Sequence, residues 1–296
     1  MRCWIIGQGL AGTQAQCEAV AAALGVQAVV KRVDLRPPWR WLSPPLAHLP
    51  PWAFSGDALA PPWPDLVLAA GRRAVAAALY VRRMSGAFTL FLQNPRVPPA
   101  LFDLVAAPAH DGLSGPNVVE TLAAPTRVTP QTLAPAGAEW AHLFAPLPRP
   151  RVALCLGGPS RAFHFRPDLS ALAPWADGLM VTPSRRTPPV ALEAAYTYDG
   201  CGPNPYLGML AWADHIVVTA DSASMLSDAA STGTPVHILP LPRRRAGAAR
   251  RLERLHANLI AHGAARPFSG ALDTWAYAPL DDAEEVAEVI RERMGA

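Results

Sequence analysis

The sequence predicts an α/β protein built from two Rossmann-like, doubly wound domains that face each other across a cleft. Segments with strand-like and helix-like patterns alternate through both halves of the 296-residue chain, and a glycine turn follows the first strand of each half. Such alternation is typical of parallel sheets covered by helices. The length suits two domains. We expect an N-terminal Rossmann-like domain at 1–147 and a C-terminal Rossmann-like domain at 148–296, joined near the segment LPRPR at 147–151.

The first half opens with a βαβ pattern. Expected strands lie at 3–6, 27–33, 65–69, 88–93 and 102–106, and expected helices at 13–24 and 71–84. The segment 37–64 is rich in proline and tryptophan, and we expect it to be irregular because proline removes backbone donors and breaks helices and strands.

The second half repeats the alternation. Expected strands lie at 152–156, 178–182, 215–219 and 235–239, with helices near Leu169 and at 205–213 and 222–232. In the last helix Asp282 is the expected cap, with Glu285 three residues on and apolar residues at helical spacing. This helix is a candidate to pack back on the N-terminal domain.

Composition restricts the class of protein. Hydrophobic residues make up 51% of the chain and charged residues 17%, so sizeable cores are expected. No apolar run reaches the roughly 18 residues of a spanning helix, and the N-terminus lacks a signal-peptide pattern. We therefore expect a cytoplasmic protein, with peripheral contact at the inner face of the membrane as an alternative. The net charge of +3 does not indicate nucleic-acid binding, and the four scattered cysteines predict reduced, mostly buried thiols.

The first candidate site is the loop GQGLAG, in which Gly7, Gly9 and Gly12 form a literal GxGxxG motif between a strand and a helix. Such a loop lets a phosphate approach the amides of a helix N-terminus. Asp34 ends the next strand, where a dinucleotide fold holds ribose hydroxyls. Three interpretations stay open: a site for NAD or a flavin, a turn needed only for packing, or an acceptor-side loop.

The second half carries the residue types of a diphosphate site. A glycine turn follows the expected strand 152–156, and small hydroxyl residues follow the strand 215–219 at a helix start. Free amides there could hold a diphosphate, arginines at the end of strand 178–182 could pair with phosphate oxygens, and a carboxylate farther along the helix could reach a ribose. Helix capping, surface arginines and a plain helix-entry turn are the competing explanations. The candidates are Gly157, Gly158, Ser160, Ser184, Arg185, Arg186, Asn204, Asp221, Ser222, Ser224 and Asp228.

Two further groups are weaker candidates. His110 and Asp111 are adjacent in sequence and could supply a general base for a hydroxyl acceptor, or form a solvated loop pair. A basic stretch could touch an anionic membrane or phosphates, or form a solvated helix face; it comprises Arg243, Arg244, Arg245, Arg250, Arg251 and Arg254. No clustered Cys/His spacing indicates a metal site.

Several long stretches resemble, in order, the mitochondrial fission Elm-type family. They include LVLAAGRRAVAAAL, VAAPAHDGLSGPNVVET, VALCLGGPSRAFHF, VTPSRRTPP and DGCGPNPYLGMLAWADHIVVTADSASMLSDAASTGTPV, followed by RPF and LDTWAYAPLDD. The family has plant members implicated in mitochondrial division, and its pattern is similar to GT-B glycosyltransferases. The resemblance implies a nucleotide-sugar pocket lined by Gly157, Gly158, Ser160, Ser184, Arg185, Asn204, Asp221, Ser222 and Ser224.

The chain departs from the family pattern at two points. Thr13 stands where the opening loop usually has a histidine, and Ser227-Asp228 stands where the later helix usually has Ser-Glu. The shorter carboxylate of Asp228 makes the ribose contact less secure.

Three functions follow as hypotheses. The first is a transferase that uses a nucleoside-diphosphate sugar as donor, with an unknown acceptor and no cofactor or metal, because helix amides can stabilise the leaving diphosphate. The second is a non-catalytic adaptor of GT-B shape that acts through partners or a membrane surface. The third, less favoured, is an NAD-dependent enzyme that uses the GxGxxG loop.

Overall fold

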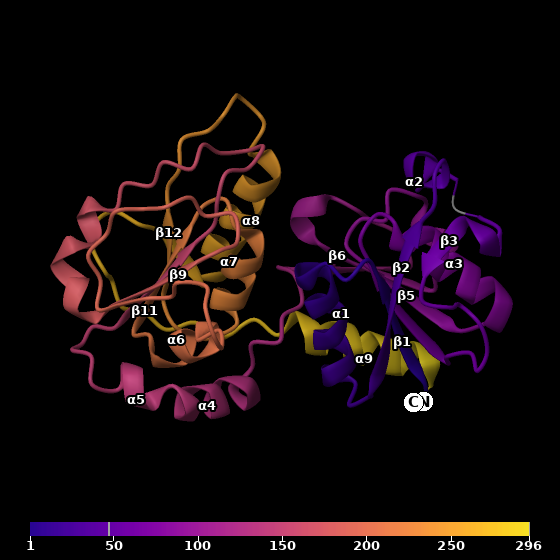
Figure 1. The fold of residues 1–296 in the computed structure, drawn as a ribbon, viewed down its shortest axis with the longest axis horizontal. Coiled ribbons are helices and arrows are strands. Elements are labelled where there is room, and N and C mark those ends of the chain that lie inside the picture. The colour runs from indigo at the N-terminus through magenta and orange to yellow at the C-terminus, as the bar shows by residue number, and fades with distance from the viewer. Residues whose placement is uncertain (47, 296) are drawn as a thin grey trace. The chain divides into compact units, whose positions relative to one another are not determined.

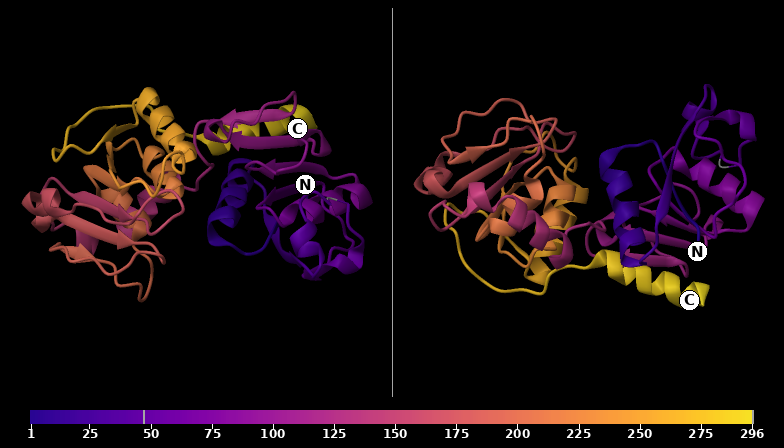
Figure 2. Two further views of the ribbon diagram at one scale, coloured as in Figure 1. Left: turned by 90° about the horizontal axis from the view of Figure 1, so that it is seen from above. Right: turned by 60° about the horizontal axis from the view of Figure 1, so that its bottom comes forward.

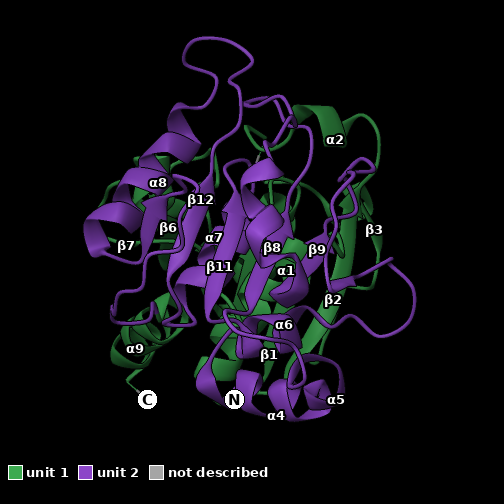
Figure 3. Ribbon diagram, turned by 90° about the vertical axis from the view of Figure 1, so that its left-hand side faces the viewer, with its two compact units in different colours: residues 1–127, 281–296 green, residues 128–280 purple. Residues whose placement is uncertain are grey.

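A computed structural model describes residues 1–46 and 48–295 and divides the chain into two compact units (Figures 1 and 3). Unit 1 comprises Met1–Arg127 and Asp281–Ala296, and unit 2 comprises Val128–Leu280. The units therefore divide between Arg127 and Val128, upstream of the expected linker at 147–151. The reason lies in helix α4 (Pro130–Glu139), which packs against α6 (Tyr206–Trp212) within unit 2.

Unit 1 is a doubly wound sheet with the strand order β3-β2-β1-β4-β5-β6-β7. All pairs are parallel except β2 with β3. The central strands are continuous apolar runs because helices cover both of their faces. The strands are β1 (Cys3–Gly7), β2 (Ala28–Leu35), β3 (Phe54–Gly56), β4 (Leu66–Ala70), β5 (Phe88–Leu92), β6 (Leu104–Pro108) and β7 (Val118–Thr121), and the helices are α1 (Ala11–Ala23), α2 (Trp39–Leu42), α3 (Ala74–Ser85) and α9 (Asp282–Met294).

The C-terminal helix α9 belongs to unit 1, where it contacts α1 and β7 (Figure 2). The prediction that Asp282 caps this helix is wrong: Asp281 is the N-cap and accepts a hydrogen bond from the Glu284 amide at 3.2 Å. The side chain of Asp282 is buried and accepts from the amides of Leu122 and Ala123 at 2.8 and 3.1 Å. Its burial raises the pKa of this carboxyl to about 6.

Unit 2 is a second doubly wound sheet, all parallel, with the order β10-β9-β8-β11-β12-β13. The order reverses between β8 and β11, so the loops after these two strands meet at a topological switch point. Its strands are β8 (Val152–Leu156), β9 (Leu179–Pro183), β10 (Tyr196–Thr197), β11 (His215–Thr219), β12 (Val236–Leu239) and β13 (Ala265–Pro267), and its remaining helices are α5 (Ala141–Phe144), α7 (Ala223–Ala230) and α8 (Arg250–His262).

The two sheets confirm the predicted fold class, two Rossmann-like α/β domains in sequence. Short elements were not predicted. One of them is β3, which lies inside the proline-rich segment that we expected to be irregular. The helix expected near Leu169 is a 3-10 helix at Ser170–Gly178, and Pro174 inside it cannot donate to an α-helical ladder. Cys3, Cys17 and Cys155 are free and buried, and Cys201 is free and exposed.

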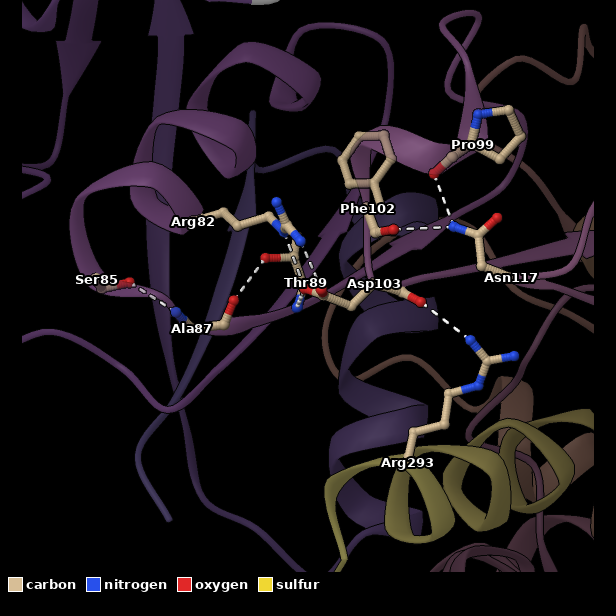
Figure 4. Close-up of polar contacts among 9 residues, drawn as sticks. All are labelled: Arg82, Ser85, Ala87, Thr89, Pro99, Phe102, Asp103, Asn117 and Arg293. Atoms are coloured by element: carbon tan, nitrogen blue, oxygen red, sulfur yellow. Dashed lines mark hydrogen bonds and ion pairs between the residues drawn. The ribbon is translucent and has the colours of Figure 1, made fainter.

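A polar network around Asp103 joins α3, β5, β6 and α9 in unit 1 (Figure 4). Its carboxylate accepts two hydrogen bonds from the Arg82 guanidinium, at 3.0 and 2.7 Å, and one from the Thr89 amide at 2.8 Å. Its backbone carbonyl accepts from Arg293 of α9 at 3.2 Å. The side chain of Asp103 is 26% exposed, so water weakens these bonds only in part.

We expect Asp103→Asn to lower the free energy of unfolding of unit 1 by about 1–2 kcal/mol, because a charged acceptor with three donors becomes a neutral one. Urea unfolding at neutral pH measures the effect. Arg127→Gln is the control, since it alters an ion pair with Glu18 in which the arginine is 57% exposed. A change there of less than about 0.5 kcal/mol is expected, and equal losses in the two variants would contradict a special role for Asp103.

Candidate functional site

The glycine turn after β8 is bonded directly to the turn after β11 at the switch point of unit 2. The amide of Gly157 donates to Oγ1 of Thr219 at 2.8 Å, and the amide of Gly158 donates to Oδ2 of Asp221 at 2.8 Å. In open α/β sheets ligands bind at the carboxyl ends of the strands at such a reversal. The sequence-predicted residues Gly157, Gly158 and Asp221 therefore form one cluster.

Close approach explains why both positions of this turn are glycine. A Cβ added at Gly157 would lie 2.3 Å from a carboxylate oxygen of Asp221, and one added at Gly158 would lie 2.5 Å from the carbonyl oxygen of Arg186. Real Cβ atoms do not come so near to other heavy atoms. A side chain at position 157 would therefore displace the Asp221 carboxylate, and one at position 158 would displace the backbone at Arg186.

Asp221 is the most deeply buried acid of this cluster, with 5% of its surface exposed. Its Oδ2 accepts from Gly158, whereas Oδ1 is buried and has no hydrogen-bond partner within the described residues. A buried acceptor without a donor is costly. Oδ1 therefore lacks the donor that a ligand hydroxyl or amide entering beside this turn would supply.

The loop after β9 supplies a third wall. The hydroxyl of Ser184 donates to the Gly157 carbonyl at 3.0 Å, and Oγ1 of Thr187 accepts from the Ser184 amide at 2.7 Å while also bonding to that carbonyl. Arg186 donates from Nη1 to the Pro159 carbonyl at 3.5 Å. Arg185 is exposed and makes no hydrogen bond or ion pair with the rest of the described chain, so its guanidinium remains open to a ligand.

Helix α7 begins beside the glycine turn with its amides open. Ser222 is the N-cap, yet its hydroxyl makes no capping bond. Its amide donates a hydrogen bond to the Thr219 carbonyl at 3.2 Å. The amides of Ala223, Ser224 and Met225 in the first turn find no acceptor among the described residues. Open amides and the helix dipole at one end favour an anion.

Farther along α7, Asp228 is linked to α6. The hydroxyl of Tyr206 donates to Oδ2 of Asp228 at 3.0 Å, and burial raises the pKa of this phenol well above its usual value, so it stays protonated and donating. Oδ1 of Asn204 accepts a hydrogen bond from the Tyr206 amide at 3.0 Å, so Asn204 forms the helix-entry turn. Ser160 likewise serves its own loop, bonding the amides of Ala162 and Phe163.

The site thus gathers some of the predicted residues and leaves others apart. Gly157, Gly158, Ser184 and Asp221 meet through direct contacts, whereas Ser222 is the N-cap of α7 and Ser224 lies in the first turn of that helix. Sequence reasoning missed Thr187, Thr219 and Tyr206. Position gave a usable signal for Thr219, which is the last residue of a strand that ends at the switch point.

In unit 1 the GxGxxG loop joins β1 to α1, but its surroundings differ from a dinucleotide site. Both carboxylate oxygens of Asp34 accept from Arg73, at 3.2 and 3.0 Å, so this acid is already ion-paired. A Cβ at Gly9 would lie 3.5 Å from the Arg32 side chain, and one at Gly12 would meet nothing within 4 Å. The third glycine is therefore not required for close helix packing, which is its role in a dinucleotide fingerprint.

His110 and Asp111 lie at the carboxyl end of β6, in a short turn of the sheet of unit 1. Their side chains are 3% and 6% exposed, so they are buried rather than on a solvated loop, and Nε2 of His110 lies 3.9 Å from Oδ1 of Asp111. Their use as a general base stays a prediction.

The basic stretch is only in part helical, and Arg243 and Arg244 make contacts within unit 2. Arg243 pairs with Glu253 of α8, and Arg244 donates from Nε to the Phe163 carbonyl at 3.3 Å. Within residues 1–46 and 48–295, no three histidine, cysteine, aspartate or glutamate side chains form a group that could hold a metal ion. None of the described helices combines the length and apolarity needed to cross a bilayer.

The successive doubly wound units place the protein in the class of α/β proteins with two Rossmann-like units. The chain belongs to the Mitochondrial fission ELM1 family, whose model matches residues 11–294. This confirms the resemblance found in the sequence.

Among relatives, the mitochondrial fission protein ELM1 of Arabidopsis thaliana is 29% identical over 279 residues, which cover 79% of this chain and 64% of that protein. The present chain therefore spans less than two thirds of the length of this relative. The uncharacterized protein RP120 of Rickettsia prowazekii is 26% identical over 285 residues, covering 77% of this chain and 79% of the relative.

Solved structures are similar at lower identity. The UDP-GlcNAc 2-epimerase of Neisseria meningitidis, solved with UDP-GlcNAc bound, is 10% identical, with 99% of each chain covered and a TM-score of 0.49. The glycosyltransferase SnogD of Streptomyces nogalater is 16% identical, covering 100% of this chain and 94% of that one, with a TM-score of 0.44. Likeness at this level identifies no ligand.

Proposed function

We propose that the protein is a glycosyltransferase that binds a nucleoside-diphosphate sugar in unit 2 and transfers the sugar without a metal. One observation carries the proposal: the open amides of the first turn of α7 lie next to a glycine turn whose closeness to Asp221 and Arg186 excludes side chains. Such an arrangement admits a diphosphate against backbone donors.

In this proposal the diphosphate sits at the start of α7. The bond between the anomeric carbon and the diphosphate oxygen breaks as an acceptor hydroxyl oxygen bonds to that carbon, and the hydroxyl proton passes to a base. Charge grows on the leaving diphosphate, where the amides of Ala223 and Ser224 and the guanidinium of Arg185 stabilise it. Preorganised donors of this kind serve the purpose that a metal ion serves elsewhere.

Two side chains are suited to orient the donor. Oδ1 of Asp221 is buried and has no partner among the described residues, so a hydroxyl of the donor that enters beside it would give it a hydrogen bond. Asp228 can reach a ribose only while it shares its carboxylate with the hydroxyl of Tyr206, which already occupies Oδ2. We therefore assign Asp221 the larger share of donor binding.

A non-catalytic adaptor is the second candidate, because a relative at 29% identity is a mitochondrial fission protein. In that case the candidate site in unit 2 binds a nucleotide or no ligand, and the protein acts through partners. An NAD-dependent enzyme is the weaker third candidate, since Arg73 occupies both carboxylate oxygens of Asp34.

Thermal melting with UDP, ADP, GDP, dTDP and NAD distinguishes the candidates, because a ligand that binds the native state raises its melting temperature. We expect one nucleoside diphosphate at about 100 times its Kd to stabilise unit 2 by about 2.7 kcal/mol. The Ser222→Ala/Ser224→Ala variant should lose part of this shift, and Arg185→Gln should lose more, since it removes a charge.

Stabilisation by NAD alone would contradict the proposal and favour the third candidate. Stabilisation by a nucleoside diphosphate with no hydrolysis or transfer of the matching nucleotide sugar, even over long incubation, would favour the adaptor. Asp34→Asn provides the matched control in unit 1, and it should leave the response to nucleoside diphosphates unchanged.

A further inference from the structure

Four large apolar residues in one segment of unit 1 are exposed and unused by the proposed function. In the segment 36–53, between β2 and β3, Trp41 and Trp52 are 67% and 63% exposed, and Leu42 and Leu46 are 45% and 47% exposed. We call these four residues the tryptophan face. Leu42 and Leu46 are joined by a backbone hydrogen bond of 3.3 Å, so they follow each other along one turn.

The segment is fixed to unit 1 from its inner side. Leu49, Ala53 and Phe54 are buried in the core that contains α3. Arg72 donates two hydrogen bonds to the Ser43 carbonyl, at 3.2 and 2.8 Å, and Arg36 donates one to the Phe54 carbonyl at 3.1 Å. The outward position of the four apolar side chains is therefore part of the fold and not the result of a frayed loop.

Aromatic packing supports the same arrangement. Trp52 meets Trp39 edge to face at a centroid separation of 5.4 Å, and Trp39 packs on the buried core in turn. Exposure of a large indole is costly in water, and several together are typical of a surface that meets another apolar phase.

The charge of the segment indicates which kind of apolar phase these side chains meet. No aspartate or glutamate occurs between Asp34 and Asp57, whereas Arg36 and Arg40 lie within this stretch. The Arg40 guanidinium lies 5.9 Å from the Trp41 ring centroid. Indoles with arginines and without acids are suited to the boundary between anionic headgroups and acyl chains.

Hydrogen-bonding capacity favours a bilayer over a protein partner. The segment carries six prolines, at positions 37, 38, 44, 45, 50 and 51, and proline has no amide to donate. A typical protein interface is crossed by about ten direct hydrogen bonds. A bilayer surface requires none of fixed geometry, only apolar burial and charge.

We propose that the tryptophan face binds the surface of a bilayer that contains anionic lipids, with Trp41 and Trp52 inserted at headgroup level and Arg40 at the lipid phosphates. The face lies wholly in unit 1 and is independent of the proposed transferase site. It differs from the basic stretch at 243–254, where Arg243 and Arg244 are engaged by Glu253 and a backbone carbonyl.

Co-sedimentation of the full chain with vesicles tests the proposal. Vesicles of equal parts phosphatidylglycerol and phosphatidylcholine should bind the wild type, and pure phosphatidylcholine should bind it more weakly. The partition coefficient of the Trp41→Ala/Trp52→Ala variant should be lower than that of the wild type by about tenfold or more, because two inserted side chains are removed. Arg40→Gln should weaken binding to the anionic vesicles only, and raised salt should reduce that difference.

Val29→Ala/Met84→Ala is the matched control, since it removes apolar side chains of unit 1 that are 56% and 50% exposed but lie outside the face. It should bind like the wild type, as should Arg245→Gln, and unchanged melting temperatures show that each variant folds. Absence of wild-type binding, or equal binding by the tryptophan variant, would overturn the proposal. So would self-association in solution that disappears in the tryptophan variant while vesicles remain unbound, because the face would then join copies of the protein.

Discussion

Replacing Gly158 by alanine is expected to weaken nucleoside-diphosphate binding on the order of 100-fold, the cost of displacing binding groups by about 1 Å. The added methyl would lie 2.5 Å from the carbonyl oxygen of Arg186 and 2.7 Å from its carbonyl carbon. Because these are backbone atoms, the turn must shift, and the Gly158 amide then leaves Oδ2 of Asp221. Isothermal titration with the nucleoside diphosphate that stabilises the wild type measures the change.

The chain offers a matched control in its other glycine motif. An alanine methyl at Gly12 would meet nothing within 4 Å, and the residue lies inside α1, where alanine is the better helix former. Gly12→Ala should therefore bind as the wild type does and melt at the same temperature or slightly higher. Normal binding by Gly158→Ala, or an equal loss in Gly12→Ala, would show that the site does not depend on the turn after β8.

The second large effect concerns pH. His237 is 2% exposed and lies in an aromatic cluster of unit 2, with the Trp275 ring centroid 5.2 Å away and Nδ1 of His215 3.4 Å from its Nε2. Burial first, and then the neighbouring His215, lowers the pKa of His237 to about 4, and burial lowers the pKa of His215 as well. Asp273 opposes the shift and Arg266 adds to it, without reversing its direction.

The sign follows from the neutral folded form. Above the ordinary histidine pKa of about 6.5, His237 is neutral in both the folded and the unfolded state, so the free energy of unfolding is at its full value. As the pH falls from about 6.5 to 4, only the unfolded state binds a proton at His237. The free energy of unfolding of unit 2 therefore decreases by up to about 3 kcal/mol. Urea unfolding at pH 7.5 and pH 4.5 measures this loss. His237→Gln should lose markedly less on acidification than the wild type, whereas the exposed control His142→Gln should lose as much. Equal losses in wild type and His237→Gln would contradict the assignment.

Unit 1 contains a group that acts in the opposite direction. The carboxyl of Asp282 has a pKa of about 6, above that of a free aspartate, so its contribution is present at low pH and is lost as pH rises through about 6. The two effects oppose each other between pH 4 and 6 in a signal from the whole chain. Comparing variants in each unit is therefore more informative than a single acid titration.

The regular elements were predictable where periodicity was strong. The buried strands β4 and β8 are unbroken apolar runs followed by glycine, and β11 has an apolar centre, Ile216 to Val218, between a histidine and a threonine. Such runs are typical of central parallel strands. Short pieces such as β3 and β13 were missed because three residues carry too little pattern. The predicted role of Asp282 as N-cap was wrong because Asp281 carries the same carboxylate acceptor one position earlier. Only the packing of α9 decides which of the two side chains faces solvent.

The candidate site shows the same division. Glycines and hydroxyl residues at strand ends were recognisable, so the sequence placed Gly157, Gly158, Asp221 and Ser222 after β8 and β11; their use in ligand binding stays a prediction. The bond between Tyr206 and Asp228 joins residues on different helices, and no local pattern reports it. The ion pair between Asp34 of β2 and Arg73, the N-cap of α3, is equally invisible in sequence and changes the interpretation of the GxGxxG loop.

By itself the sequence determined the family, the two doubly wound units and the strand ends at which chemistry is expected, because these follow from local periodicity and from the residue types that turns and helix starts require. Only the tertiary structure decided which amides stay open, which acids are already paired and which tryptophans face outward. Those properties depend on neighbours that are distant in the chain, and burial and partnership are fixed only when the sheets are assembled.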